Sequence, residues 1–234
     1  MKREWATLCL AILLGCLGYS QETGAIEGFV GFADAFPPRK TVRVARDQEV
    51  CGHSKPNESF LVDADSRGLA NAVVYWIPPS SSHTKKGEPA PIVLAQSQCR
   101  YEPHVQVGSV GAMLEIVNND GILHNIHAYD GRDETLFNIA QPGVMKSMKR
   151  SLDDVSGVIK FKCDVHSWMN GYLLIFSDAI YAITDSTGRY ALSGVSAGDQ
   201  EIRIWHERLG EVTRSVQVDP SEPAVLDLVI EPNR

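Results

Sequence analysis

Short strand-like segments recur along most of the chain, and they limit the possible folds more than any other feature. Most are rich in β-branched and aromatic residues and are bounded by Gly, Pro, Asn or Asp. They span residues 25–32, 72–77, 104–107, 113–117, 124–129, 158–162, 172–176, 202–205 and 216–218. No window of eleven residues has a convincing helical period. The pattern predicts an all-β protein built of sandwiches.

Composition removes several functional classes. The 234 residues are 44% hydrophobic and 22% charged, which is an ordinary globular balance. The formal net charge of −7 argues against the positively charged surface that binding to nucleic-acid phosphates requires. No apolar run reaches the roughly 18 residues that a membrane-spanning helix needs. We therefore expect neither a nucleic-acid partner nor a spanning helix.

Residues 1–20 have the layout of a secretory signal. A short positive start is followed by an uncharged apolar stretch from Trp5 to Leu17, and small residues come next. Leu13-Leu-Gly-Cys16 also resembles a bacterial lipoprotein cleavage box, which would end the signal at residue 15 and leave a lipidated Cys16. Plain cleavage after Ser20 and a buried N-terminal helix are the alternatives. Both processed forms predict an exported protein, periplasmic or anchored in the envelope. Its only expected membrane contact is the lipid on Cys16, which the lipoprotein form alone would carry.

The cysteines outside the signal are Cys51, Cys99 and Cys163. Disulfides persist outside the cytoplasm, and an odd count leaves one thiol for another role. Cys163 lies among other potential metal ligands, so the expected disulfide joins Cys51 to Cys99. Two free buried thiols are the alternative.

The segment most typical of a functional site is Cys163-Asp-Val-His166-Ser-Trp-Met169, between two strand-like segments. Upstream, His124 begins another strand. One thiolate, two imidazoles and a weak thioether form the ligand set of a blue-copper site, in which soft sulfur donors suit Cu(I) and the imidazoles also accommodate Cu(II). The spacing predicts one mononuclear copper ion that holds the loop to a distant strand.

Residues 99–177 resemble the cupredoxins, in particular the amicyanin and plastocyanin group. The resemblance includes Pro-His-Val-Gln-Val-Gly at 103–108 and Leu-His-Asn-Ile-His at 123–127. It implies a Greek-key sandwich with His124, Cys163 and His166 as strong ligands and Met169 as a weak axial ligand. It also implies that Asn125 steadies the cysteine loop. Ser167 departs from the pattern, because amicyanin-like loops often carry Pro there, and this suggests a less stiff loop.

The two ends of the chain resemble halves of a carboxypeptidase regulatory-like, transthyretin-like β-sandwich. Gly24-Ala-Ile-Glu-Gly-Phe-Val and Leu69-Ala-Asn-Ala-Val-Val-Tyr-Trp match its opening, and residues 184–199 with the strand at 202–205 match its close. We expect this sandwich to comprise residues 24–91 plus 178–234, with the cupredoxin domain at 92–177 inserted. Two or three small domains in series are the alternative. Pro78 to Pro91, polar and rich in Ser, Lys and Pro, predicts an exposed connection.

Other readings of the histidines and of the site stay open. His127 lies three residues after His124, so in a strand it faces the opposite side and is expected at the surface or beside the ligands. His104 and His206 are isolated in sequence, and a second metal site there is a weaker alternative. The Cys/His loop itself could hold zinc, although a thioether is an unusual zinc donor, or no metal at all.

The sequence favours a one-electron carrier over an enzyme. Cys163 is flanked by Lys162 and Asp164, so the His-Cys-His pattern of multicopper oxidases is absent, and the loop lacks a second cysteine for a dinuclear site. No nucleophile elbow and no His-Glu-x-x-His occurs. We therefore expect an exported blue-copper protein that exchanges electrons with a redox partner protein. Copper binding for delivery, or a non-catalytic envelope interaction module, is the alternative.

Overall fold

The computed structural model describes residues 22–33, 41–79 and 88–231. The described residues form nineteen strands and one four-residue helix, α1 (Gln48–Cys51), which confirms the all-β prediction. None of their helices has the length and apolar character needed to cross a membrane. The predicted signal at 1–20, including Cys16, lies outside the described residues, and so does the middle of the predicted connection at 78–91.

The first sandwich is built from one continuous stretch of chain. One sheet has the order β10 (Thr135–Gln141), β9 (His124–Tyr129), β12 (Gly157–Lys162), β13 (Asn170–Phe176) and β7 (Val105–Ser109). The other has the order β11 (Ser147–Ser151), β8 (Met113–Asn118), β5 (Ile92–Ser97) and β6 (Arg100–Glu102). The pairs β13–β7 and β5–β8 are parallel, and the others are antiparallel. Inward-facing residues such as Leu114, Ile116, Ile159 and Phe161 fill the core between the sheets.

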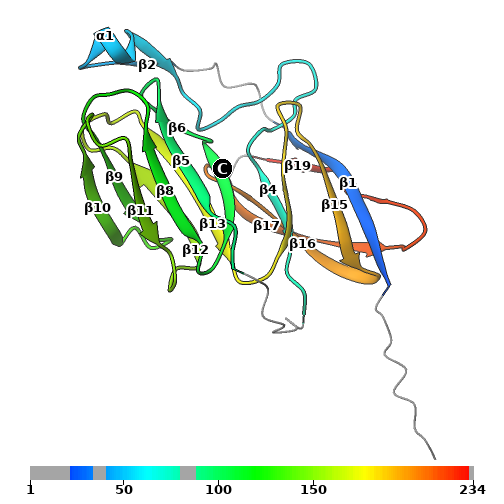
Figure 1. The fold of residues 1–234 in the computed structure, drawn as a ribbon. Coiled ribbons are helices and arrows are strands. Elements are labelled where there is room, and N and C mark those ends of the chain that lie inside the picture. Colours follow the sequence, from blue (N-terminus) through cyan, green and yellow to red (C-terminus); the bar gives the residue numbers. More distant parts are fainter. Residues whose placement is uncertain (1–21, 34–40, 80–87, 232–234) are drawn as a thin grey trace, which may run out of the picture.

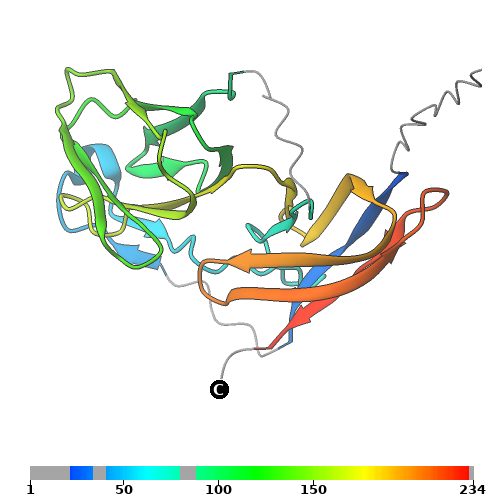
Figure 2. The same ribbon diagram turned by 90° about the horizontal axis from the view of Figure 1, so that it is seen from below.

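The second sandwich takes strands from both ends of the chain. One sheet joins β15 (Arg189–Ser196), β1 (Thr23–Phe32) and β18 (Ala224–Val225), and β19 (Leu228–Ile230) also pairs with β1. The other has the order β14 (Ile180–Ile183), β4 (Val73–Trp76), β16 (Gly198–His206) and β17 (Gly210–Val218). Figures 1 and 2 both show this sandwich, with its blue, orange and red strands, beside the green and yellow strands of the first.

The chain leaves the second sandwich after β4 and returns to it at β14. These two strands are antiparallel neighbours, with Trp76 opposite Ile180, so the ends of the intervening segment meet. Adjacent ends are what the insertion of one folded unit into another requires. The topology is compatible with an insertion, while the boundaries at 92 and 177 and the transthyretin-like relationship stay predictions.

A segment from before β4 packs on the first sandwich. Residues 41–59, here named the cap, form the hairpin of β2 (Thr41–Arg43) and β3 (Ser54–Pro56) with α1 between its strands. Val44 and Cys51 are buried in the core of the first sandwich, and Figure 1 shows α1 and β2 at its upper end. The disulfide between Cys51 and Cys99, which the cysteine count predicted, fastens the cap there. The predicted boundaries had placed residues 41–59 with the regulatory-like sandwich.

Candidate metal centre

Strand ends bring three candidate ligands together. His124 is the first residue of β9, while Cys163 follows the last residue of β12. Antiparallel pairing of these strands, with Lys162 opposite His127, places the start of β9 beside the end of β12. His166 lies in the tight loop that runs from Cys163 to β13 and is closed by a hydrogen bond from the Met169 N–H to the His166 carbonyl, 2.9 Å.

The donor atoms of His124, Cys163 and His166 converge on one point. These three atoms all lie within 4.8 Å of one another. The Nδ1 atoms of the two histidines are 2.9 Å apart, and Cys163 Sγ is 3.7 Å from His166 Nδ1. Such a group of two imidazoles and a thiol fits copper or zinc.

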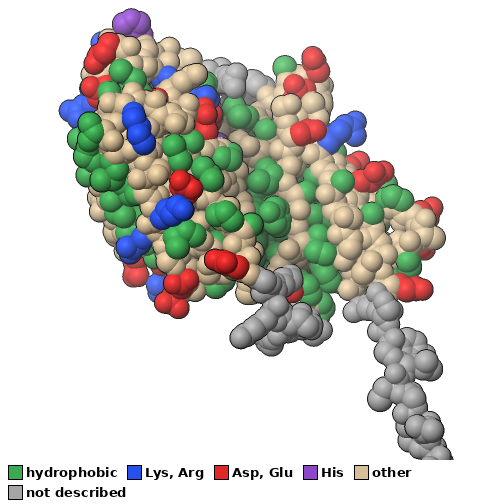
Figure 3. All heavy atoms as spheres, viewed as in Figure 1, with side chains coloured by type: hydrophobic (Ala, Val, Ile, Leu, Met, Phe, Trp, Pro, Cys, Tyr) green, Lys and Arg blue, Asp and Glu red, His purple; other side chains and the backbone are tan. Residues whose placement is uncertain are grey.

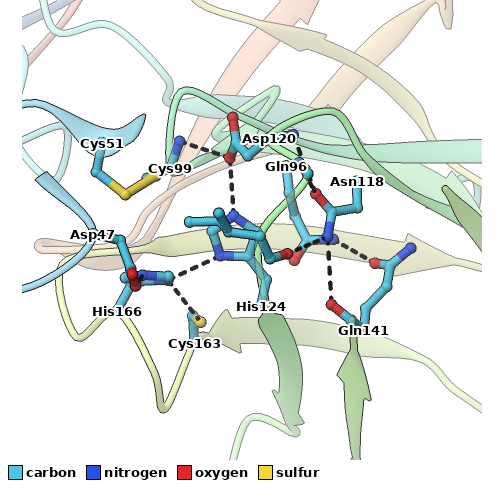
Figure 4. Close-up of polar contacts among 12 residues, drawn as sticks. Asp47, Cys51, Gln96, Cys99, Asn118, Asp120, His124, Gln141, Cys163 and His166 are labelled. Atoms are coloured by element: carbon cyan, nitrogen blue, oxygen red, sulfur yellow. Dashed lines mark hydrogen bonds and ion pairs between the residues drawn. A yellow bond between two sulfur atoms is a disulfide. The ribbon is translucent and has the colours of Figure 1, made fainter. Parts of the chain in front are cut away.

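Two carboxylates hold the outward nitrogens of these histidines. Asp120 Oδ2 lies 2.9 Å from His124 Nε2, and Asp47 Oδ2 lies 2.8 Å from His166 Nε2. Figure 4 shows His124 and His166 between these carboxylates, with Cys163 below. A hydrogen bond of this kind fixes the ring and leaves the other nitrogen unprotonated to bind a metal. The arrangement therefore fits a metal bound through both Nδ1 atoms.

Burial and charge act on these groups in opposite directions. Burial alone would lower the pKa of His124, but hydrogen bonds with Asp120 and Cys163 raise it to about 9. Burial alone would raise the pKa of Cys163, but hydrogen bonds with His124 and His166 lower it to about 6. In the metal-free protein, the thiolate and the imidazolium therefore stabilise each other.

Asn125 ties the cysteine loop to β9, as the cupredoxin resemblance implied. Its side-chain oxygen accepts hydrogen bonds from the N–H groups of Asp164 and Val165, and its own N–H lies 3.5 Å from Cys163 Sγ. Its amide group also donates to Asp164. The loop is thus held at several atoms, although Ser167 stands where a proline was expected.

A polar network supports the loop that carries Asp120. The Asn118 side chain accepts from the N–H groups of Asp120 and Gly121 and donates to the carbonyl of Ile122. Behind it, the buried side chains of Gln96 and Gln141 are hydrogen-bonded to each other (Figure 4). This network sets the position of Asp120 and therefore of the His124 ring.

The candidate site is closed to solvent. His124 and His166 are 0% exposed, and Cys163 is 2% exposed. Met169 is also buried, in the same core cluster as Cys163. Trp168 packs on His166, with ring centroids 5.1 Å apart, and donates a hydrogen bond to the carbonyl of Cys99. The cap covers the site from outside through Asp47.

Three other histidines among the described residues, His104, His127 and His206, do not belong to this cluster. His127 faces the other side of β9, as strand alternation predicts, where it contacts Asp164 and stacks on Tyr129. The Nε2 atom of buried His104 is hydrogen-bonded to the Glu207 carboxylate, and His206 accepts a hydrogen bond from the Arg208 N–H. Among the described residues, a second group of potential ligands comprises Cys99, Asp120 and His124, but Cys99 is consumed by the disulfide.

Comparisons with known proteins found likenesses only to solved structures. No family model and no curated protein matches the chain. A mutant of amicyanin in its reduced Cu(I) form is 20% identical over 43% of this chain and 97% of its own, with a TM-score of 0.32. A purple cupredoxin from Nitrosopumilus maritimus is 23% identical over 37% and 98%, with a TM-score of 0.31.

A copper-containing nitrite reductase from Thermus scotoductus is also similar, at 20% identity over 43% of this chain and 26% of its own, with a TM-score of 0.33. All three likenesses concern less than half of this chain. A metal is therefore inferred from the side chains of this chain alone.

Sequence reasoning missed both carboxylates. Asp120 lies four residues before His124, inside an Asn-Asn-Asp-Gly stretch whose turn chemistry already explains an aspartate. Asp47 lies 119 residues from His166 and has no local signal. Only the fold places the cap beside the cysteine loop.

Proposed function

We propose that this chain is a mononuclear blue-copper protein that carries single electrons, with His124, Cys163 and His166 as strong ligands and Met169 as a weak one. The observation that supports it most directly is the convergence of two Nδ1 atoms and one thiol, with both Nε2 atoms bound to carboxylates. When bound, copper supplies a one-electron couple between Cu(I) and Cu(II). The protein holds the donors in place and excludes water.

The burial of the site favours electron transfer over copper delivery. A protein that hands its metal to an acceptor needs ligands that the acceptor can reach. Here the two histidines are fully buried, and His166 is also capped by Asp47 on a disulfide-bonded segment. Electron transfer needs no such access to the ligands, and Trp168, which contacts His166, is partly exposed.

Export and a redox partner belong to the same proposal. The disulfide between Cys51 and Cys99 fits an oxidising compartment, in agreement with the secretory layout of residues 1–20. There the chain would exchange electrons with a redox partner protein and catalyse no reaction of its own.

The test is optical and paramagnetic spectroscopy of the purified protein loaded with Cu(II). We expect an intense thiolate-to-Cu(II) charge-transfer band, and reversible reduction with copper retained. Cys163→Ser and His124→Ala should each abolish the band. His127→Ala is the matched control, because this histidine lies on the other side of β9, and it should leave the band nearly intact.

Three results would contradict the proposal. If the protein exposed to Cu(II) stays pale and shows no redox activity, the remaining explanations of the site are zinc binding or a metal-free sandwich. Ready transfer of copper to an acceptor without a stable colour would instead indicate delivery. A band lost in His127→Ala would show that the ligands are assigned wrongly.

A further inference from the structure

A second candidate site lies where the two sandwiches and the cap meet. It is a cleft of about 640 Å³, a size typical of small-ligand sites. Its walls come from β3 of the cap, from β12 and β13, and from the turn after β16. Trp168 and Tyr172 give it an aromatic surface.

Positive charge gathers in this cleft, although the chain as a whole has a net charge of −7. Five cationic side chains line it: Lys55, Arg100, Lys160, Lys162 and Arg208. Lys160 and Lys162 stand two residues apart on one face of β12, opposite Tyr172 and Asn170 of β13. On the face drawn in Figure 3, by contrast, acidic and basic side chains are interspersed.

The acidic residues of the cleft do not cancel this charge. Glu58 is bound to Arg100 at 2.9 Å, and Glu207 is 3% exposed and bound to His104. In the part of the chain that the structure describes, Lys55, Lys162 and Arg208 form no ion pair. Three cations of the cleft therefore lack an ion pair, and of these the Lys162 ammonium lies over the Tyr129 ring, 5.5 Å from its centroid.

Two of the cations repel each other. Burial, and next the charge of Arg100, lower the pKa of Lys55, while the carboxylates of Asp120, Glu58 and Glu102 act in the opposite direction. Negative charge placed between these groups would relieve the repulsion and form charge-assisted hydrogen bonds.

We propose that this cleft binds a small anion with at least two negative charges, of the phosphate or polycarboxylate type. The volume of the cleft suits such a molecule, and its cations come from three separate parts of the chain. Because Trp168 lines the cleft and contacts His166, a bound anion lies one side chain away from the candidate metal centre. Binding itself does not require the proposed copper function.

The test is calorimetric titration of the folded, metal-free protein with inorganic phosphate and, separately, with citrate, at low ionic strength. We expect one site per chain for at least one of the two anions, and the stronger of them identifies the ligand type. Lys162→Gln and Arg208→Gln should each weaken binding at least about fivefold, because each removes a charge-assisted contact. Added sodium chloride should also weaken it.

Lys149→Gln is the matched control. Lys149 is exposed on β11, which lies at the opposite edge of its sheet from β6 and Arg100, so its removal should leave binding unchanged. The proposal is overturned if neither anion binds, or if Lys149→Gln weakens binding as much as the two cleft variants do. Since no copper is present, the result is independent of the spectroscopic test of the metal centre.

Discussion

At the scale of single residues, the hydrogen bond at one nitrogen of an imidazole decides which nitrogen is free for a metal. Asp120 and Asp47 bind the Nε2 atoms of His124 and His166, so both Nδ1 atoms are left to face Cys163. Asp120 is nearly buried, with a side chain 6% exposed, whereas that of Asp47 is 36% exposed. The buried contact should therefore contribute more to the stability of the site.

We predict that Asp120→Asn weakens copper binding by about 10- to 100-fold, because the amide no longer stabilises the correct tautomer of His124. Asp47→Asn should have a smaller effect in the same direction. The measurement is competition with a chelator of known affinity. Asp133→Asn, which changes an exposed aspartate away from the site, is the control. Equal affinities in all four proteins would show that the carboxylates do not position the ligands.

A second prediction concerns Met169, whose role rests on the cupredoxin resemblance. Met169→Gln should lower the reduction potential without loss of copper, because an axial ligand tunes the metal more than it binds it, and an amide oxygen favours Cu(II). Potentiometric titration of both proteins measures the change. An unchanged potential would mean that Met169 only packs in the core.

The structure brings together three of the candidate ligands that the sequence singled out, whereas the sequence did not predict their surroundings. His124, Cys163 and His166 were recognisable because each lies at the end of a strand or in a loop of fixed spacing. The positions of Asp120 and Asp47 depend on the loop before β9 and on the cap, so residue spacing carried no signal for them.

At the scale of elements, the predicted strands have an apolar or β-branched face, but β5 and β10, which also carry apolar residues, were not among the predicted segments. The strand predicted at residues 124–129 agrees with β9 at both ends, and 113–117 and 158–162 agree with β8 and β12 to within one residue. The edge strand β11 (Ser147–Ser151) is mostly polar and exposed, and it forms because β8 offers a partner. Helix α1 is too short to show a period.

The cap is the element that closes the candidate site, and the disulfide holds it there. We predict that the Cys51→Ala/Cys99→Ala double variant loses about 4 kcal/mol of unfolding free energy, since the disulfide closes a loop with a sequence separation of 48. Denaturant unfolding measures this loss. Freed from its anchor, the cap should also let a chelator remove copper several-fold faster.

Chemical reduction of the unaltered protein is the control for the cap prediction, and it should reproduce both effects. Unchanged copper release in a folded double variant would show that Asp47 and the packing of Val44 hold the cap without the disulfide.

At the scale of the whole molecule, the two sandwiches share a buried junction. Val73, Tyr75 and Trp205 of the second sandwich pack against Val105 and Leu174 of the first. Aromatic contacts extend the junction, with Tyr75 on Phe176 at 4.6 Å and Tyr172 on Trp205 at 5.4 Å between ring centroids. The sequence did not predict this contact, because it depends on the outer faces of two sheets that form separately.

His206, at the end of β16 beside Trp205, has its ring on Phe60 at the core of the second sandwich, and we expect it to make the fold sensitive to acid. The residue is 2% exposed, and burial together with the charges of His104 and Arg208 lowers its pKa to about 4, although Glu207 acts in the opposite direction. The unfolded chain takes up this proton near pH 6.5, the folded protein only near pH 4. The unfolded state therefore binds more protons between these values, and stability falls as the pH is lowered through this window.

We predict that His206 alone lowers the unfolding free energy by about 3 kcal/mol when the pH falls from 6.5 to 4. The variant His206→Gln should not show this contribution. Denaturant unfolding at a series of pH values measures it. His53→Gln replaces an exposed histidine of the cap and is the control. This variant should lose as much unfolding free energy between pH 6.5 and pH 4 as the unaltered protein does. If His206→Gln lost as much unfolding free energy as the unaltered protein between pH 6.5 and pH 4, His206 would not be the source of the acid sensitivity.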